Sequence, residues 1–153
     1  MANLQEQREM ERALHAGLNF LQNGEKVRAL EILIRLQDQD HPLAHYFVAT
    51  FKMKTANGNP IPNLTDAVTH YERAIEQKPD FADAYLMLAR AQRQIAAAEI
   101  EEVGVNPKGN DRHRSLLYSA EDNLTHASRL NPSFSEAVRH EKRMISGIQE
   151  FLE

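Results

Sequence analysis

The chain contains seven histidines, a residue type that can bind metals and transfer protons. Two of them, His41 and His45, are four positions apart. This spacing puts two imidazoles on one face of a helix, an arrangement that zinc sites use. However, Pro42 lies between them at a predicted helix start, and no third ligand accompanies them. We therefore expect no metal and no cofactor, with the histidines serving as capping or surface residues.

The sequence carries no complete catalytic motif. His140 and Glu141 begin like a zinc-protease helix, but Met144 stands where the second histidine would be. The absence of cysteine excludes a thiolate nucleophile, no serine lies in a nucleophile elbow, and the glycines at 104 and 109 lack the Lys-Ser/Thr pair of a phosphate-binding loop. We expect a non-enzymatic protein. An unrecognised enzyme or metal-binding protein, with a site assembled from distant helices, is the less favoured alternative.

Opposite charges face each other across one predicted turn. Acidic residues end one helix and basic residues follow the turn: Glu99, Glu101 and Glu102, then Lys108, Arg112 and Arg114. Both groups oppose the dipole of the helix that carries them. Mutual pairing is one explanation, and a second partner contact at the hairpin tip, through Lys108, Arg112 and Arg114, is the other.

Composition limits the class of partner. A length of 153 residues suits one domain, 1–153, and 42% apolar with 26% charged residues are globular proportions. A net charge of −4 provides no basic field for nucleic acid. The first ten residues are polar, and no run reaches the apolar length of a membrane span. We expect a cytoplasmic protein that binds neither nucleic acid nor membrane.

Apolar residues recur at helical spacing, with Gly or Pro between the runs, and predict seven helices. Their approximate ranges are 4–21, 25–37, 43–54, 64–77, 81–102, 112–130 and 133–152. Asn63 or Thr65 is expected to cap the fourth helix, and Ser133 with Glu136 matches a capping box before the last. Residues 55–63 and 104–111 read as loops.

Two stretches of the chain repeat one pattern of small and large residues. The matching positions, 53 residues apart, are Ala67, Tyr71, Ala74 and Pro79, then Ala120, Leu124, Ala127 and Pro132. Small residues let the second helix of a pair approach its neighbour, the large residue fills the gap, and proline ends the helix. Together with Tyr85, Leu88 and Ala89, these residues resemble the tetratricopeptide repeat.

The resemblance implies an all-α fold, a right-handed superhelical array of antiparallel helix pairs, with about seven helices. Repeat 1 would cover about 10–42, repeat 2 about 43–80 with the loop 55–63, and repeat 3 about 81–132 with a long hairpin insertion at 96–113. A capping helix would follow at about 133–152. Spacings of 38 residues from Ala29 to Ala67, and 53 from Ala67 to Ala120, exceed the family's 34.

In this family the first helix of each pair lines a concave groove. When the family's groove positions are transferred to this chain, most of them hold apolar residues: Leu14, Leu18, Leu21, Phe47, Phe51, Leu86 and Arg90. The chaperone-tail subclass has Lys and Asn where this chain has Leu14 and Leu18, and Lys and Arg where it has Asp83 and Met87, so a carboxylate clamp is disfavoured. An apolar groove suits a peptide or amphipathic helix. The alternative is that these side chains pack on one another.

The resemblance and the predicted groove together favour a protein-protein interaction module, acting as an adaptor, scaffold or chaperone. Its partner would be another protein, which presents a peptide or an amphipathic helix to the groove. Self-association through the same surface, giving a structural homo-oligomer, is the main alternative.

Overall fold

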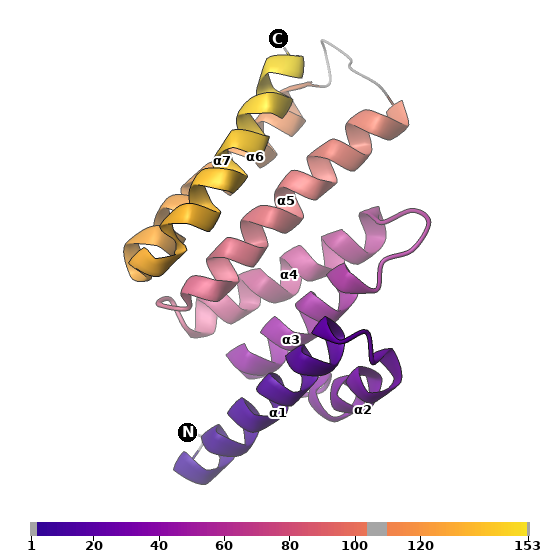
Figure 1. The fold of residues 1–153 in the computed structure, drawn as a ribbon, viewed down its shortest axis with the longest axis vertical. Helices are drawn as coiled ribbons and strands as arrows, with labels where there is room; N and C mark the ends of the chain where they lie inside the picture. Colours follow the sequence, from indigo (N-terminus) through magenta and orange to yellow (C-terminus); the bar gives the residue numbers. More distant parts are fainter. Residues whose placement is uncertain (1–2, 104–109, 153) are drawn as a thin grey trace.

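The computed structural model describes residues 3–103 and 110–152 and is built from helices (Figure 1). They are α1 (Leu4–Gln22), α2 (Lys26–Leu36), α3 (Pro42–Lys54), α4 (Ile61–Gln77), α5 (Ala82–Val103), α6 (Asn110–Leu130), a short 3-10 helix η1 (Pro132–Phe134) and α7 (Ser135–Leu152). The part of the chain that the structure describes contains no strand, so the all-α prediction with seven α-helices is confirmed. No helix within it is both long and apolar enough to cross a membrane.

The helices stack along the long axis of the molecule, from α1 and α2 at one end to α7 at the other (Figure 1). Successive helices pack in pairs, α1 with α2, α3 with α4 and α5 with α6. Alternate helices also touch, because α3 contacts both α1 and α5, and α5 contacts α7. These contacts are consistent with the predicted helix pairs, while the handedness of the array stays a prediction.

Two helix starts differ from the sequence-based expectation. Helix α4 begins at Ile61, where the Asn59 side chain accepts a hydrogen bond from the Ile61 amide, while Asn63 donates to the Lys52 carbonyl. Before α7, the Ser133 hydroxyl donates to Asn131 Oδ1 at 2.6 Å. The predicted caps at Asn63 and Ser133 are therefore wrong, because nearby asparagines take up the free amides and hydroxyl instead.

The repeated pattern lies at the centre of the packing. Ala67, Tyr71 and Ala74 on α4 are completely buried, and the matching residues on α6 are equally buried: Ala120, Leu124 and Ala127. Such small residues permit close helix approach, as their spacing predicts. The prolines that follow both helices, Pro79 and Pro132, lie beyond the last helical residues Gln77 and Leu130.

The buried residues form two hydrophobic clusters that meet on α5. The first joins α1, α2, α3, α4 and the start of α5, and includes Phe47, Tyr71 and Leu88. The second joins α5, α6 and α7, and includes Leu86 and Leu117. Helix α5 therefore contributes to both cores and holds the two ends of the stack together.

Candidate partner-binding surface

Most of the residues predicted to line a groove lie in the core. Phe47 is completely buried, and Leu14 and Leu86 are each only 7% exposed. Leu18 and Phe51 are half-buried and pack against the same cluster. Phe47, Leu14 and Leu86 therefore offer almost no surface to a partner. Leu14 and Phe47 pack in the first hydrophobic cluster, and Leu86 packs in the second with residues of α6 and α7.

Leu21 is half-buried in the same way. Most of the predicted groove residues therefore pack against other side chains of the protein, which is the alternative to an open groove. A role in binding remains a prediction for the half-buried residues Leu18, Leu21 and Phe51.

Arg90, the only charged residue in the predicted groove, is engaged inside the protein. Its Nε atom donates to Glu141 Oε1 at 2.9 Å, and Arg93 Nε donates to Glu141 Oε2 at 2.8 Å. The Glu141 side chain is only 5% exposed. Two guanidinium groups on α5 thus stabilise a buried carboxylate on α7. The sequence hides this contact, since its members are about fifty residues apart.

An open apolar groove lies between α5 and α7, which we call the α5–α7 groove. It has a volume of about 550 Å³ and is lined by apolar residues: Ala97, Ile100, Met144, Gly147, Ile148 and Phe151. Arg93 and Glu101 also line it. Phe151 is 63% exposed and Met144 is 40% exposed, so both present apolar atoms to solvent. In the sequence, Met144 and Phe151 are seven residues apart, with Gly147 and Ile148 between them. This helical spacing is the pattern from which the groove could have been predicted.

A second apolar surface lies at the other end of the stack. Val27, Leu30 and Ile34 follow one another along α2 and are all exposed, Val27 to 74%. We call this row the α2 stripe. It lies on a single helix, whereas the α5–α7 groove lies between two helices.

Two of the opposite charges of the long hairpin, on Glu99 and Arg112, pair with each other. Glu99 near the end of α5 accepts from Arg112 at 2.8 Å and from His113 at 3.0 Å, both on α6. Arg114 donates to the Leu152 carbonyl at 3.1 Å and lies 3.6 Å from Asp111. Lys108 lies outside the described residues. Internal pairing thus occupies the two described basic residues of the predicted tip contact, and only Arg112 keeps most of its side chain exposed.

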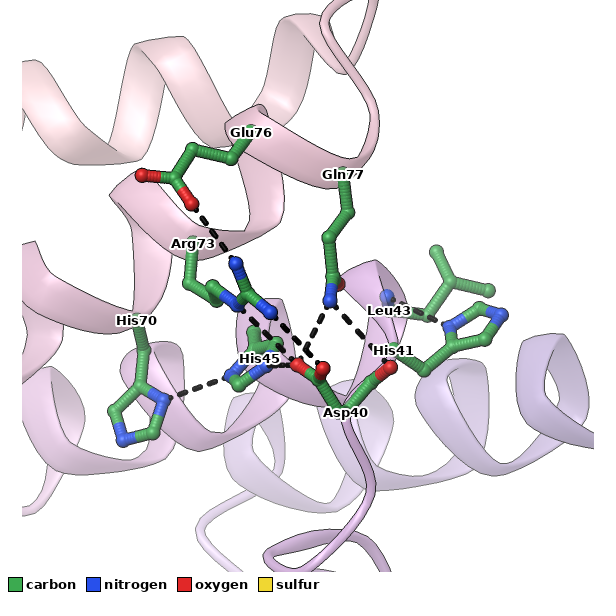
Figure 2. Close-up of polar contacts among 8 residues, drawn as sticks. All are labelled: Asp40, His41, Leu43, His45, His70, Arg73, Glu76 and Gln77. Carbon is green, nitrogen blue, oxygen red and sulfur yellow. Dashed lines mark hydrogen bonds and ion pairs between the residues drawn. The ribbon is translucent and has the colours of Figure 1, made fainter.

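A polar cluster surrounds Asp40, in the linker between α2 and α3 (Figure 2). Its carboxylate accepts from Arg73 Nη2 at 3.0 Å, from His45 Nε2 at 2.8 Å and from Gln77 Nε2 at 2.7 Å. The bond from Arg73, followed by those from His45 and Gln77, holds the pKa of the Asp40 carboxyl well below its usual range. The cluster thereby ties the linker to α3 and α4.

The two histidines weighed as metal ligands point to different partners. His41 Nδ1 accepts from the Leu43 amide and its Nε2 meets Gln7 Oε1 at 2.9 Å, whereas His45 Nδ1 lies 3.0 Å from His70 Nδ1. The described part of the chain contains no group of three or more His, Asp or Glu residues that could hold a metal ion. These histidines therefore act as links between helices α1, α3 and α4.

Comparisons of the chain with protein-family models, with curated proteins and with solved structures found no match.

Proposed function

We propose that this protein is an interaction module whose α5–α7 groove binds an amphipathic helix of a partner protein. The observation that carries the proposal is the open apolar depression with Phe151 and Met144 exposed at its edge. An exposed aromatic residue beside an apolar floor is a typical anchor of a protein interface. A helix laid into such a groove would bury its apolar face against both α5 and α7.

Gly147 on α7 supports this assignment. Glycine inside a helix costs about 1 kcal/mol relative to alanine. Nothing lies within 4 Å of a Cβ atom built on Gly147, so packing inside the protein does not explain the glycine. A missing side chain on the groove floor would instead let the backbone of a bound helix approach α7 closely.

The charges around the groove indicate the chemistry of the partner helix. Glu101 lines the groove and is exposed. Arg93 also lines it, but its charge is matched by the buried Glu141 carboxylate. A partner helix with an apolar stripe and a lysine or arginine beside it would suit this surface.

The resemblance to tetratricopeptide repeats gives the proposal further support. In that family the first helix of each pair lines the binding groove, and α5 and α7 are the first helices of the third repeat and of the cap. An adaptor, scaffold or chaperone in the cytoplasm is the corresponding role. The groove proposed here lies at the C-terminal end of the stack, whereas the groove predicted from the sequence runs along α1, α3 and α5.

A library of helical peptides displayed on phage provides the test. We expect wild-type protein to select peptides with apolar residues at helical spacing and a basic flank. The variant Met144→Asp/Phe151→Asp should lose at least about tenfold in affinity for the selected peptides, since charged side chains would enter the apolar contact. Circular dichroism should show unchanged helicity, because both residues are exposed.

A matched variant on the α2 stripe, Val27→Asp/Ile34→Asp, serves as the control, because both of its positions are also exposed and apolar. It should bind the selected peptides like wild type. Equal binding by the α7 variant and wild type would contradict the groove assignment, and loss only in the α2 variant would transfer the site to α2.

Self-association is a second candidate function, favoured by the α2 stripe. Three exposed aliphatic side chains in a row on one helix are suited to pairing with another apolar helix face. If copies of the chain associate there, the solution mass should rise with concentration, and Leu30→Glu should keep the protein monomeric. A constant monomer mass over the concentration range would exclude this function.

A further inference from the structure

His41 caps helix α3 with a neutral imidazole. Its backbone is extended and its Nδ1 atom accepts a hydrogen bond of 3.1 Å from the Leu43 amide in the first turn. An amide can only donate, so Nδ1 must carry its lone pair. The ring proton is therefore on Nε2, which donates to Gln7 Oε1 on α1 at 2.9 Å. A single imidazole thus caps α3 and joins it to α1.

Protonation of His41 is incompatible with this cap. A proton on Nδ1 would remove the acceptor for the Leu43 amide and would place two donors face to face. The resulting positive charge would also lie at the N-terminus of α3, where the helix dipole is unfavourable to cations.

A second contact at the same junction limits the number of protons that its two histidines can carry. His45 Nε2 must donate to the Asp40 carboxylate, and His45 Nδ1 lies 3.0 Å from His70 Nδ1 (Figure 2). One proton lies between the two Nδ1 atoms, so His45 and His70 cannot both be imidazolium ions while the contact lasts. This contact joins α3 to α4 next to the cap.

Charged groups from the neighbouring elements lie near these rings. Glu6 and Glu9 on α1, Arg35 on α2 and Asp40 in the linker line the same pocket as His41, and Glu11 on α1 and His45 on α3 act on its charge. Around His45 and His70 they are Asp40, Lys52 on α3, and Asp66 and Arg73 on α4. Glu11 favours the charged form of His41, but burial, followed by His45, dominates and lowers the pKa of His41.

We propose that His41 and the His45–His70 pair make the junction of α1, α3 and α4 an acid-sensitive hinge. Protonation at Nδ1 removes the α3 cap, while Nε2–H still donates to Gln7 on α1, and a second proton on the histidine pair removes its contact between α3 and α4. The first turn of α3 then opens more often as the pH falls. The α5–α6–α7 core carries no part of this device and stays closed.

The direction of the pH effect follows from linkage. Burial lowers the pKa of His70 as well as that of His41, so the closed state binds fewer protons than the open state just below the ordinary value of 6.5. The closed junction is favoured above this pH and loses stability as the pH falls towards the lowered values. In that interval each histidine raises the opening equilibrium constant by up to about tenfold per pH unit.

Amide hydrogen exchange on the full chain tests the hinge, with rates corrected for the intrinsic effect of pH. Between about pH 7.5 and about pH 5.5, the protection of the Leu43, Ala44 and His45 amides should fall, by up to about tenfold for each of His41 and His70. Amides in α6 and α7 should keep their protection. His41→Asn should reduce the pH effect on the first turn of α3, because asparagine caps helices at both pH values while the His45–His70 pair remains.

His126→Gln is the matched control, because His126 is exposed and stacks on Tyr85 away from the hinge. It should behave like wild type. Equal protection of wild-type α3 at both pH values, or an undiminished pH effect in His41→Asn, would overturn the proposal. Nitrogen NMR of wild-type His41 gives a measurement without any variant: a proton on Nε2 near neutral pH supports the hinge, and a proton on Nδ1 contradicts it.

Discussion

Gly17 on α1 lies against the ring of Phe47 on α3, so closely that a Cβ atom at position 17 would come 2.7 Å from Phe47 Cζ. The Phe47 ring is completely buried in the first hydrophobic cluster. Gly17→Ala should therefore destabilise the protein by about 1–2 kcal/mol, because overpacking outweighs the gain of about 1 kcal/mol in helix propensity. Urea unfolding followed by circular dichroism measures the difference.

Gly147→Ala should have the opposite effect. Its Cβ atom would meet nothing within 4 Å, so the helix propensity of alanine adds about 0.5–1 kcal/mol of stability without a steric cost. The same unfolding experiment checks both glycines. If both variants lose stability, the open space assigned to Gly147 is incorrect.

Glu141→Ala should cost about 2–3 kcal/mol in the free energy of unfolding. The substitution leaves the guanidinium groups of Arg90 and Arg93 without their carboxylate. The loss falls below that of a fully buried ion pair, because the Arg90 side chain is 33% exposed. The exposed Glu150 provides a control, since Glu150→Ala should leave the unfolding midpoint unchanged within the error of the measurement.

Tyr71→Phe should destabilise the protein by about 1 kcal/mol. The Tyr71 hydroxyl lies 2.7 Å from Thr50 Oγ1 in the first core, and burial raises the pKa of Tyr71 well above its usual range. Removing the hydroxyl leaves Thr50 bonded to the Tyr46 carbonyl alone. Tyr118→Phe on the exposed face of α6 should have no effect, and a similar loss at both positions would argue against the Thr50 contact.

Asp40→Asn should weaken the link between α3 and α4 at neutral pH but make little difference in strong acid. Arg73 holds the pKa of Asp40 below its ordinary value of 3.8. The carboxylate therefore stabilises the fold above that value, and its contribution is lost as the pH falls through the lowered pKa. Thermal unfolding of wild type and variant from about pH 7 to about pH 2 should show the two midpoints converging at the acid end.

The helices could be predicted from sequence because their signals are local. Ala67 and Ala120 mark helices that pack closely, and both are completely buried. The start of α4 was less predictable. The sequence predicts Asn63 or Thr65 as the cap, but Asn63 donates to the Lys52 carbonyl of another helix and Thr65 donates to the Ile61 carbonyl. Local sequence thus fixes the type of an element more firmly than its ends.

The residues of the candidate site were harder to predict, because a binding residue must be exposed and the sequence does not show how deeply each side chain is buried. Phe47 and Phe151 are the same residue type on predicted helices, yet one is completely buried and the other is 63% exposed. The difference arises from tertiary packing, since α3 contacts α1, α2, α4 and α5, whereas α7 has neighbours on fewer sides. Helical periodicity identifies an apolar face but not the number of helices that cover it.

Within the described ranges 3–103 and 110–152, each α-helix contacts only helices one or two places away along the chain. The segments that must meet are therefore separated by short lengths of chain, which keeps the entropy cost of bringing them together small. Chains with such local contacts fold in about microseconds to milliseconds. The α1–α2 hairpin can form on the ribosome before α7 has been synthesised, and the protein can assemble in the order in which it is made.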